Sequence, residues 1–440
     1  MKDTPIPFSI VKDKIAASGL AKVGRASIRE TVRLVSEIEA ASGIKFVRME
    51  MGVPGLAPAK VGIDAEIEAL RNGVAQIYPV IDGLPALKKE ISRFVKNFIN
   101  IDVDARGCIP TVGSMQGGMA SFLLTNRLHA EKDTVLFIDP GFPVQKQQLK
   151  VLGMKYETFD VYNFRGEKLK AKLEQYLSKG NISTIIYSNP NNPSWICFTE
   201  NELKTIGELA TQHDVIVIED LAYFAMDFRK DLSKPGQPPY QATVANYTDN
   251  WMMLISSSKA FSYAGQRIGC LVINNKLYSR RFPDLKRYFS SDEFGHAMIY
   301  GAVYALSSGT THSTQYGLAA MLKAANDGNF NFVEEVKVYG NRAAAMKKMF
   351  TSNGFKIVYD MDEDKPLADG FYFTISYPGL SGEDLIEELL YYGISAISLA
   401  ITGSERTEGL RACVSQVADS QLPDLELRLK KFHEHHPVSA

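Results

Sequence analysis

The chain is poor in the features that most quickly assign a protein to a class. Cysteine is scarce: the 440 residues include four, Cys108, Cys197, Cys270 and Cys413. They lack the spacing of metal ligands and three lie in or beside apolar runs, so we expect buried free thiols rather than disulfides or a zinc site. Net charge is nearly absent, at −1, which gives no electrostatic reason to expect a nucleic-acid or a membrane partner.

Long apolar runs are missing as well. No stretch approaches the ~20 apolar residues that cross a membrane. The opening MKDTPIPFSIVKDKIAASG has acidic residues where a secretory signal needs a continuous apolar core. These absences predict a cytoplasmic protein. His433, His435 and His436 cluster near the end of the chain without a cysteine or carboxylate cage, so we expect a solvated tail there and no metal.

What the chain does contain is a series of apolar runs of strand length that alternate with helical segments. The runs are 134–138, 182–187, 215–218 and 252–255, and one intervening helix opens at Thr199 in capping-box style. This alternation is typical of βαβ units, so we expect a mostly parallel sheet flanked by helices, with a ligand site beyond the carboxyl ends of the strands. Polar and aromatic residues follow these runs and would line one crevice: Asp139, Phe142, Asn192, Asp220, Tyr223 and Lys259.

The last of these strand ends carries a lysine. The apolar run 251–255 leads into Ser256-Ser257-Ser258-Lys259, and Arg267 precedes a second apolar run, 269–273. A lysine at the end of a buried strand is partly desolvated, which favours the neutral, nucleophilic amine. Such an amine can form a Schiff base with an aldehyde, and the serines and Arg267 suit a dianionic phosphate. A lysine on a solvated loop is the alternative interpretation.

A helix that starts near Ser114 is a second candidate for anion binding. It opens with small residues, Gly113-Ser114-Met115-Gln116-Gly117-Gly118, and is expected to run to about Leu128. Free N–H groups at the positive end of a helix can bind a phosphate, although a glycine-rich helix start also serves plain packing.

The two ends of the chain do not follow the βαβ pattern. Near the N-terminus we expect helices at 27–40, 64–72 and 85–98; Arg25, Arg29 and Arg33 form a stripe that we interpret as a solvated face, with a part in substrate gating left open. After about residue 308 the pattern predicts a smaller α+β domain that the N-terminal helix joins. We expect a large domain at 51–325 and a small domain at 1–50 and 326–440. The C-terminal elements expected are helices 314–325, 332–353 and 382–391 and strands 370–377, 394–401 and 409–416.

The residues that follow the strands also stand in a characteristic order. That order is Asn192-Pro193, Asp220, Tyr223, Ser256, Lys259 and Arg267, between the turn at Gly52 and Arg411. In this order the chain resembles the fold-type I, pyridoxal-phosphate-dependent aminotransferases of class I/II, over nearly its whole length. The resemblance implies an enzyme that uses pyridoxal 5′-phosphate to move an amino group between an L-amino acid and a 2-oxo acid by a ping-pong mechanism.

The resemblance implies a role for each residue around the cofactor ring. Lys259 would hold the cofactor as a Schiff base and, once the substrate amine displaces it, would move a proton from the substrate Cα. Asp220 would pair with the pyridinium nitrogen and keep it protonated. Tyr223 and Asn192 would donate to the ring 3-oxygen and lower the Schiff-base pKa. Phe142 would stack on the ring.

It also implies how the phosphate and the substrate are bound. Arg411 would clamp the substrate α-carboxylate bidentately, with the backbone at Gly52 and Asn192 helping. Tyr78 matches a tyrosine that crosses a dimer interface to the phosphate in the neighbouring subunit, which implies an obligatory homodimer. The other expected phosphate ligands are Ser114, Met115, Gln116, Ser256, Ser258 and Arg267.

The chain departs from the family pattern in two places. Where the family often has Asn-Pro-x-Asn-Pro-Thr-Gly, this chain has Ser194 and Trp195 at the last two positions, so this turn or the adjoining surface differs. After Arg287 no arginine aligns with the one that aspartate-specific relatives use for a distal carboxylate, which weakens the case for aspartate as the amino donor.

Two other functions are compatible with parts of the sequence. The same cofactor site could serve a C–S lyase that carries out β- or γ-elimination. A ligand-sensing regulator would need a DNA-binding helix-turn-helix domain, and only about 50 residues, with one clear amphipathic helix and no concentrated basic surface, precede the Gly52 turn.

Overall fold

The computed structural model describes residues 3–437, which divide into two compact units. The first unit consists of the described residues of Met1–Gly55, Asn192–Ile196 and Lys337–Ala440, and the second of Leu56–Asn191 and Cys197–Val336. Among the described residues no helix is both long and apolar enough to cross a membrane. All four cysteines are buried free thiols, as the sequence predicts.

The second unit is built on a seven-stranded sheet with the order β2-β8-β7-β6-β5-β3-β4. The strands from β7 to β4 pair in parallel, whereas β8 is antiparallel to both of its neighbours, which confirms the mostly parallel sheet expected from the sequence. Every residue of β3, β5, β6 and β7 is buried, because helices flank the sheet. The strands are β2 Cys108–Thr111, β3 Thr134–Asp139, β4 Lys155–Asp160, β5 Ile182–Ser188, β6 Ile216–Leu221, β7 Trp251–Ser256 and β8 Gly269–Ile273.

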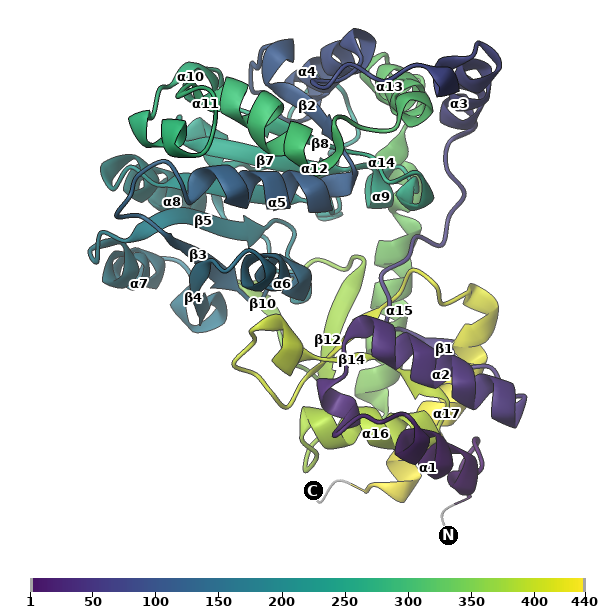
Figure 1. Cartoon of the computed structure of the whole chain (residues 1–440). Helices are drawn as coiled ribbons and strands as arrows, with labels where there is room; N and C mark the ends of the chain where they lie inside the picture. Colours follow the sequence, from purple (N-terminus) through teal and green to yellow (C-terminus); the bar gives the residue numbers. More distant parts are fainter. Residues whose placement is uncertain (1–2, 438–440) are drawn as a thin grey trace. The chain divides into compact units, whose positions relative to one another are not determined.

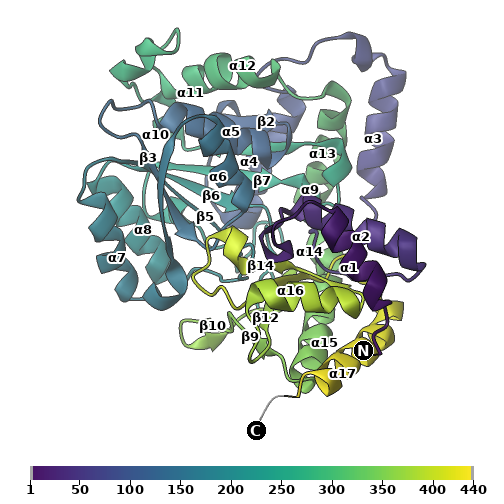
Figure 2. The same ribbon diagram turned by 60° about the horizontal axis from the view of Figure 1, so that its bottom comes forward.

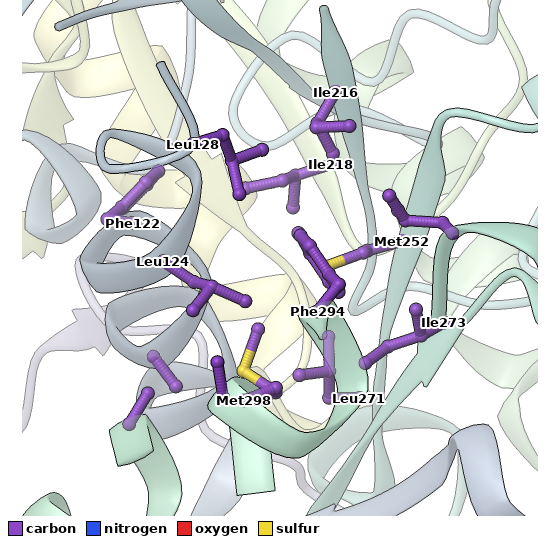
Figure 3. Packing of buried hydrophobic residues seen from close by; sticks show 14 of the residues in the cluster. Phe122, Leu124, Leu128, Ile216, Ile218, Met252, Leu271, Ile273, Phe294 and Met298 are labelled. Carbon is purple, nitrogen blue, oxygen red and sulfur yellow. The ribbon is translucent and has the colours of Figure 1, made fainter. Parts of the chain in front are cut away.

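Helices of the second unit lie on the faces of this sheet (Figure 1). Buried apolar side chains from these helices and from the strands form a shared core. Figure 3 shows Leu124, Met252 and Phe294 packing in this core, from α5, β7 and α11, which precedes a π-helix at Ala297–Val303. The predicted helix start at Thr199 is confirmed, since its side chain caps the helix and forms a capping box with Glu202. The helices are α3 Lys60–Arg71, α4 Pro85–Ile99, α5 Gly113–Thr125, α6 Pro143–Val151, α7 Lys168–Leu177, α8 Glu200–Gln212, α9 Ser257–Ala260, α10 Asn275–Ser279, α11 Phe294–His296, α12 Tyr304–Ser307, α13 His312–Asn326 and α14 Phe332–Val336.

The first unit contains a four-stranded antiparallel sheet with the order β14-β15-β12-β9, and a two-stranded parallel pair, β1 with β13. Figure 2 shows α16 beside β14, and α15 beside α17. The predicted helices 27–40 and 382–391 are both present. The elements are α1 Phe8–Ala17, α2 Ile28–Ser42, β1 Val47–Arg48, α15 Val338–Ser352, β9 Lys356–Ile357, β10 Met361–Asp362, β11 Lys365–Pro366, β12 Tyr372–Ser376, α16 Gly382–Tyr391, β13 Ile394–Ser395, β14 Ile397–Ser398, β15 Leu410–Cys413 and α17 Leu422–His435.

Three expectations about the C-terminal part are wrong. The helix expected at 332–353 is two helices separated at Lys337, where the chain passes from one unit to the other. The strand expected at 394–401 is broken, because β13 pairs with β1 whereas β14 pairs with β15. The histidines do not form a solvated tail: His433 Nδ1 lies 2.7 Å from Tyr377 Oη at the end of α17.

Candidate active site

The carboxyl ends of neighbouring strands bring most of the predicted residues to one edge of the sheet. The strands β7, β6, β5 and β3 are consecutive neighbours, and the register pairs Ser188 with Asp220 and Asp220 with Leu254. Lys259 follows β7, Asp220 ends β6 and Phe142 follows β3. Since β8 is antiparallel, its first residue, Gly269, lies at the same edge, paired with Ser256.

Lys259 lies on α9, a single helical turn fixed from both sides. The Ser256 side chain caps this turn by accepting a hydrogen bond from the Ser258 backbone N–H over 3.1 Å. The Ser257 hydroxyl donates to the Ile268 carbonyl over 2.6 Å, which ties the turn to the entry of β8. Lys259 is half-buried, so its amine is held on a rigid support at the sheet edge.

Asp220 is a buried carboxyl group that accepts two hydrogen bonds. Its Oδ1 accepts from the Ala222 backbone N–H over 3.1 Å and its Oδ2 from Gln145 Nε2 over 2.8 Å. Burial raises the pKa of Asp220 to about 6, against the lowering effect of these two donors. No Lys, Arg or His of the described residues forms an ion pair with it. The site therefore offers a negative charge at neutral pH that awaits a cation.

Gln145 itself was not among the residues singled out in the sequence. It lies in the first turn of α6, three residues after Phe142, and its side chain is buried against the sheet edge. Phe142 is the N-terminal flanking residue of α6 and is half-buried. Tyr223, in the turn after β6, is 3% exposed. The position of Gln145 just after a strand end was the one available signal for it.

Arg267 and the start of α5 lie against each other. Arg267 has a left-handed backbone, with φ of 51°, and donates from Nη1 to the Ala264 carbonyl over 2.8 Å. Gly113 has a φ of 64°, a left-handed conformation that favours glycine, and a Cβ there would come within 2.7 Å of Arg267 Nη2. No side chain caps α5, and its first N–H groups, including that of Ser114, are at its positive end. A guanidinium and open helix amides together suit a phosphate.

The rest of this helix end is held by neighbouring side chains. Gln116 Oε1 accepts from the Val112 backbone N–H over 2.8 Å, and the Met115 carbonyl accepts from Gln148 Nε2 over 2.8 Å. These contacts fix the backbone of the first turn. Tyr78, by contrast, follows a short 3-10 helix and is 91% exposed, so this single chain does not pack it against the other predicted residues.

Arg411, Asn192 and Gly52 belong to the first unit. Arg411 is 1% exposed, donates from Nη2 to the Glu50 carbonyl over 2.7 Å and from Nη1 to Asn192 Oδ1 over 3.2 Å. Its buried Nε–H has no hydrogen-bond partner among the described residues. No described carboxylate forms an ion pair with it, because the Glu50 carboxylate pairs with Arg48 instead. A buried guanidinium with an unused donor is suited to a planar carboxylate.

These residues fit pyridoxal phosphate better than they fit a metal. Asp220 suits a cationic ring nitrogen, the α5 start with Arg267 suits a phosphate, and Lys259 is an amine that an aldehyde could bind. Within residues 3–437, no group of three or more His, Cys, Asp or Glu side chains could hold a metal ion.

Known proteins resemble this chain in sequence. The sequence model of the family "Aminotransferase class I and II" matches residues 45–425. The chain is 25% identical to a "Probable aspartate aminotransferase" of Methanocaldococcus jannaschii over 76% of its own length and 78% of that protein. It is 24% identical to an aspartate aminotransferase of Pyrococcus horikoshii over 84% of each chain.

Solved structures share the fold at lower identity. The alanine aminotransferase of Pyrococcus furiosus superposes with a TM-score of 0.74 at 19% identity, covering 94% of this chain and 98% of that one. The aspartate aminotransferase of Thermotoga maritima gives a TM-score of 0.74 at 15% identity, with 97% and 99% covered. The two-unit architecture is therefore that of fold-type I aminotransferases.

Proposed function

Because the chain belongs to the class I and II aminotransferases, we propose that Lys259, Asp220 and Arg267 of the second unit bind the cofactor, and that Arg411 of the first unit binds the substrate carboxylate. The enzyme is a pyridoxal-phosphate-dependent transaminase that moves an amino group between an amino acid and a 2-oxo acid. The bound cofactor supplies an aldehyde for the amino group and a ring that stabilises the negative charge left when the substrate Cα loses its proton.

Lys259 is the proposed attachment point and base. Its Nζ would hold the cofactor through the aldehyde carbon and, as a free amine, would accept the proton of the substrate Cα. The one-turn helix α9 holds this amine at the end of β7, so the acceptor atom stays close to where the proton leaves. Tyr223 and Asn192 are proposed to donate to the ring 3-oxygen, and Phe142 to stack on the ring.

Asp220 is the observation that most strongly supports the proposal. A buried carboxyl group without a cationic partner is costly unless a ligand brings the charge that balances it. A protonated ring nitrogen at Asp220 Oδ2 or Oδ1 would do so, and ionised Asp220 would keep that proton in place. The phosphate is assigned to the N–H groups of Ser114, Met115 and Gln116 and to Arg267, with Ser256 and Ser258.

Arg411 is proposed to bind the substrate α-carboxylate, with the backbone at Gly52 beside it. Two of its donors are already fixed by the Glu50 carbonyl and Asn192, which orients the guanidinium before the substrate arrives. Its unpartnered Nε–H leaves a hydrogen bond for the carboxylate to accept.

The assembly is proposed to be a homodimer in which Tyr78 of each subunit reaches the phosphate of the other. The 91% exposure of Tyr78 and the exposed Ile77 and Val80 beside it support an interface at this loop. The proposed domains are a large cofactor-binding domain at 51–325 and a small domain formed by the N-terminal helix in 1–50 and the C-terminal α+β segment 326–440. The cytoplasmic location stays a prediction.

A donor screen tests the proposed function. Purified holoenzyme is mixed with single amino acids in the absence of an acceptor, and the visible absorbance of the lysine-bound cofactor is followed. We expect at least one donor to convert it fully to the absorbance of the amine form of the cofactor, with one 2-oxo acid per site and no ammonia. Lys259→Ala should lose both the original band and the conversion. Release of ammonia together with pyruvate from cystathionine would instead indicate the C–S lyase, which none of the relatives reported above is named for.

A further inference from the structure

Trp195 has an unusual backbone and a fully buried ring. Its φ is 66°, a left-handed conformation that is strained for a bulky residue, and its side chain is 1% exposed. The ring fills the space above Gly370, where a Cβ would come within 2.0 Å of Trp195 Cε2. A strained tryptophan that occupies the space left by a glycine is held in place by its surroundings, so its position is well defined.

The ring of Trp195 packs edge-on against Tyr372 in β12. The two ring centroids are 6.1 Å apart, with an angle of 72° between the planes. Tyr372 in turn lies under Arg411, whose Cζ is 4.4 Å from the Tyr372 ring centroid. The Tyr372 hydroxyl lies at Gly52, where a Cβ would come within 2.0 Å of Oη. Tyr372 therefore contacts both elements assigned to the substrate carboxylate.

The segment 192–196 thus supports Arg411 in two ways. Asn192 Oδ1 accepts a hydrogen bond from Nη1 in the plane of the guanidinium, whereas Trp195 acts on its face through Tyr372. The hydrogen bonds to Asn192 Oδ1 and to the Glu50 carbonyl both act at the Nη end of the guanidinium, so they still allow its plane to tilt about the line that joins these two acceptors. The Tyr372 ring, whose centroid is 4.4 Å from Cζ, opposes this tilt, and a fixed plane is what a bidentate carboxylate needs.

We propose that Trp195 and Tyr372 are positioning residues that fix the plane of the Arg411 guanidinium, and that this makes the site select substrates with an α-carboxylate over amines without one. The inference rests on the proposed role of Arg411. It assigns a function to Trp195, which otherwise only marks a departure from the family pattern.

The effect of losing this support follows from the aromatic contact. A desolvated cation over an aromatic face is held by an attraction whose loss corresponds to roughly a tenfold change in an equilibrium constant. Removing the Tyr372 ring should therefore raise the KM for an amino acid about tenfold. Replacing the Trp195 ring by the smaller ring of phenylalanine should raise this KM less, by about threefold. The Tyr372 ring would still lie over Arg411, but with more freedom to move.

The test compares an amino-acid donor from the screen with the amine that has the same side chain but no carboxylate. Single-turnover half-reactions of the holoenzyme give the apparent dissociation constant and the rate for each compound. For Tyr372→Leu and Trp195→Phe we expect weaker binding of the amino acid, unchanged reaction with the amine, and unchanged affinity for pyridoxal phosphate. Tyr372→Phe keeps the ring and should keep most of the amino-acid affinity.

Tyr392→Leu is the matched control. Tyr392 is a buried tyrosine of the same unit that packs on Phe432, so its truncation has a similar cost to the fold without touching Arg411. The proposal is overturned if Trp195→Phe and Tyr372→Leu leave the ratio of amino acid to amine binding at the value of Tyr392→Leu. Arg411→Lys distinguishes the carboxylate-binding role of Arg411 from the positioning role of Trp195 and Tyr372. If Arg411→Lys changes this ratio and the aromatic variants do not, only the positioning role fails. If Arg411→Lys leaves the ratio unchanged, the proposed role of Arg411 fails with it.

Discussion

Gln145 Nε2 donates a hydrogen bond to Asp220 Oδ2 over 2.8 Å, and both side chains are buried. This bond favours the ionised form of Asp220, whereas burial raises the pKa of that carboxyl group to about 6. A neutral amide can favour the carboxylate without neutralising it, so Asp220 keeps its charge for the cofactor.

Removal of this donor should shift the acid limb of the pH profile. In Gln145→Leu the pKa of Asp220 rises further, so the ionised form is lost at a higher pH. The half-reaction rate of the variant should therefore begin to fall at a higher pH than that of the wild type, with kcat at neutral pH reduced about five- to tenfold for a bond of ~1–1.5 kcal/mol. Stopped-flow half-reactions between pH 5 and 8 measure the limb. An acid limb at the same pH in both proteins would show that Gln145 does not act on Asp220.

Arg267 should govern affinity for the cofactor phosphate. A hydrogen bond to a charged group contributes roughly 1.5–3 kcal/mol, so Arg267→Ala should weaken pyridoxal-phosphate binding by about ten- to a hundredfold. Titration of the apoenzyme with the cofactor gives this constant. Arg33→Ala removes an exposed arginine on α2 and is the control, with no expected change. An equal loss in both variants would argue for a general charge effect instead of a phosphate contact.

Tyr78 should act in the neighbouring subunit, and mixed dimers test this. Tyr78→Ala and Lys259→Ala are each expected to impair their homodimer. In a hybrid of the two, the subunit that retains Lys259 receives Tyr78 from its partner, so one complete site forms. Hybrids prepared by refolding an equal mixture should recover activity above both parents. Recovery no greater than the average of the parents would place Tyr78 in its own subunit's site or outside any site.

Glu219, next to Asp220 on β6, should make the apoenzyme less stable as pH rises. It is 0% exposed, and burial raises its pKa to about 7 although Thr243 Oγ1 donates to it over 2.6 Å. The folded chain therefore holds a proton that the unfolded chain releases above its ordinary pKa of 4.5. Between pH 4.5 and about 7 the free energy of unfolding should fall by on the order of 1 kcal/mol per pH unit. Above that range it should no longer depend on this group.

Glu219→Gln removes this titration. Denaturant unfolding of both apoproteins from pH 5 to pH 8 gives the difference between them, in which Asp220 and the other carboxyl groups cancel. The free energy of unfolding of the wild type, relative to that of Glu219→Gln, should decrease as pH rises to about 7 and then stay constant. A constant difference across the range contradicts the raised pKa of Glu219.

The sequence predicts the position of a site residue where that residue directly follows a buried strand. The apolar runs before Asp220 and Lys259 predict buried strands, and the alternation with helices predicts their parallel order, so the common edge could be inferred without coordinates. The outer strands β2 and β4 were not predicted: β4, KYETFD, has half of its residues polar and exposed or half-buried, which hides its strand pattern.

Contacts between distant segments could not be predicted. The contacts between Trp195, Tyr372 and Arg411 join parts of the chain that lie far apart in sequence, and no local pattern at any of the three indicates the other two. The break of strand 394–401 has the same origin, since it depends on two different pairing partners. Trp195 was recognisable as a departure, but its role depends on Gly370 and Tyr372.

A transaminase carries an amino group from one molecule to another. The most direct measurement uses holoenzyme, an amino-acid donor labelled with ¹⁵N and an unlabelled 2-oxo acid whose amino form differs from the donor. We expect the ¹⁵N to appear in the new amino acid, in an amount equal to the 2-oxo acid formed from the donor, and Lys259→Ala to abolish the transfer. Recovery of the ¹⁵N as ammonia, with no labelled amino acid formed, would contradict this expectation.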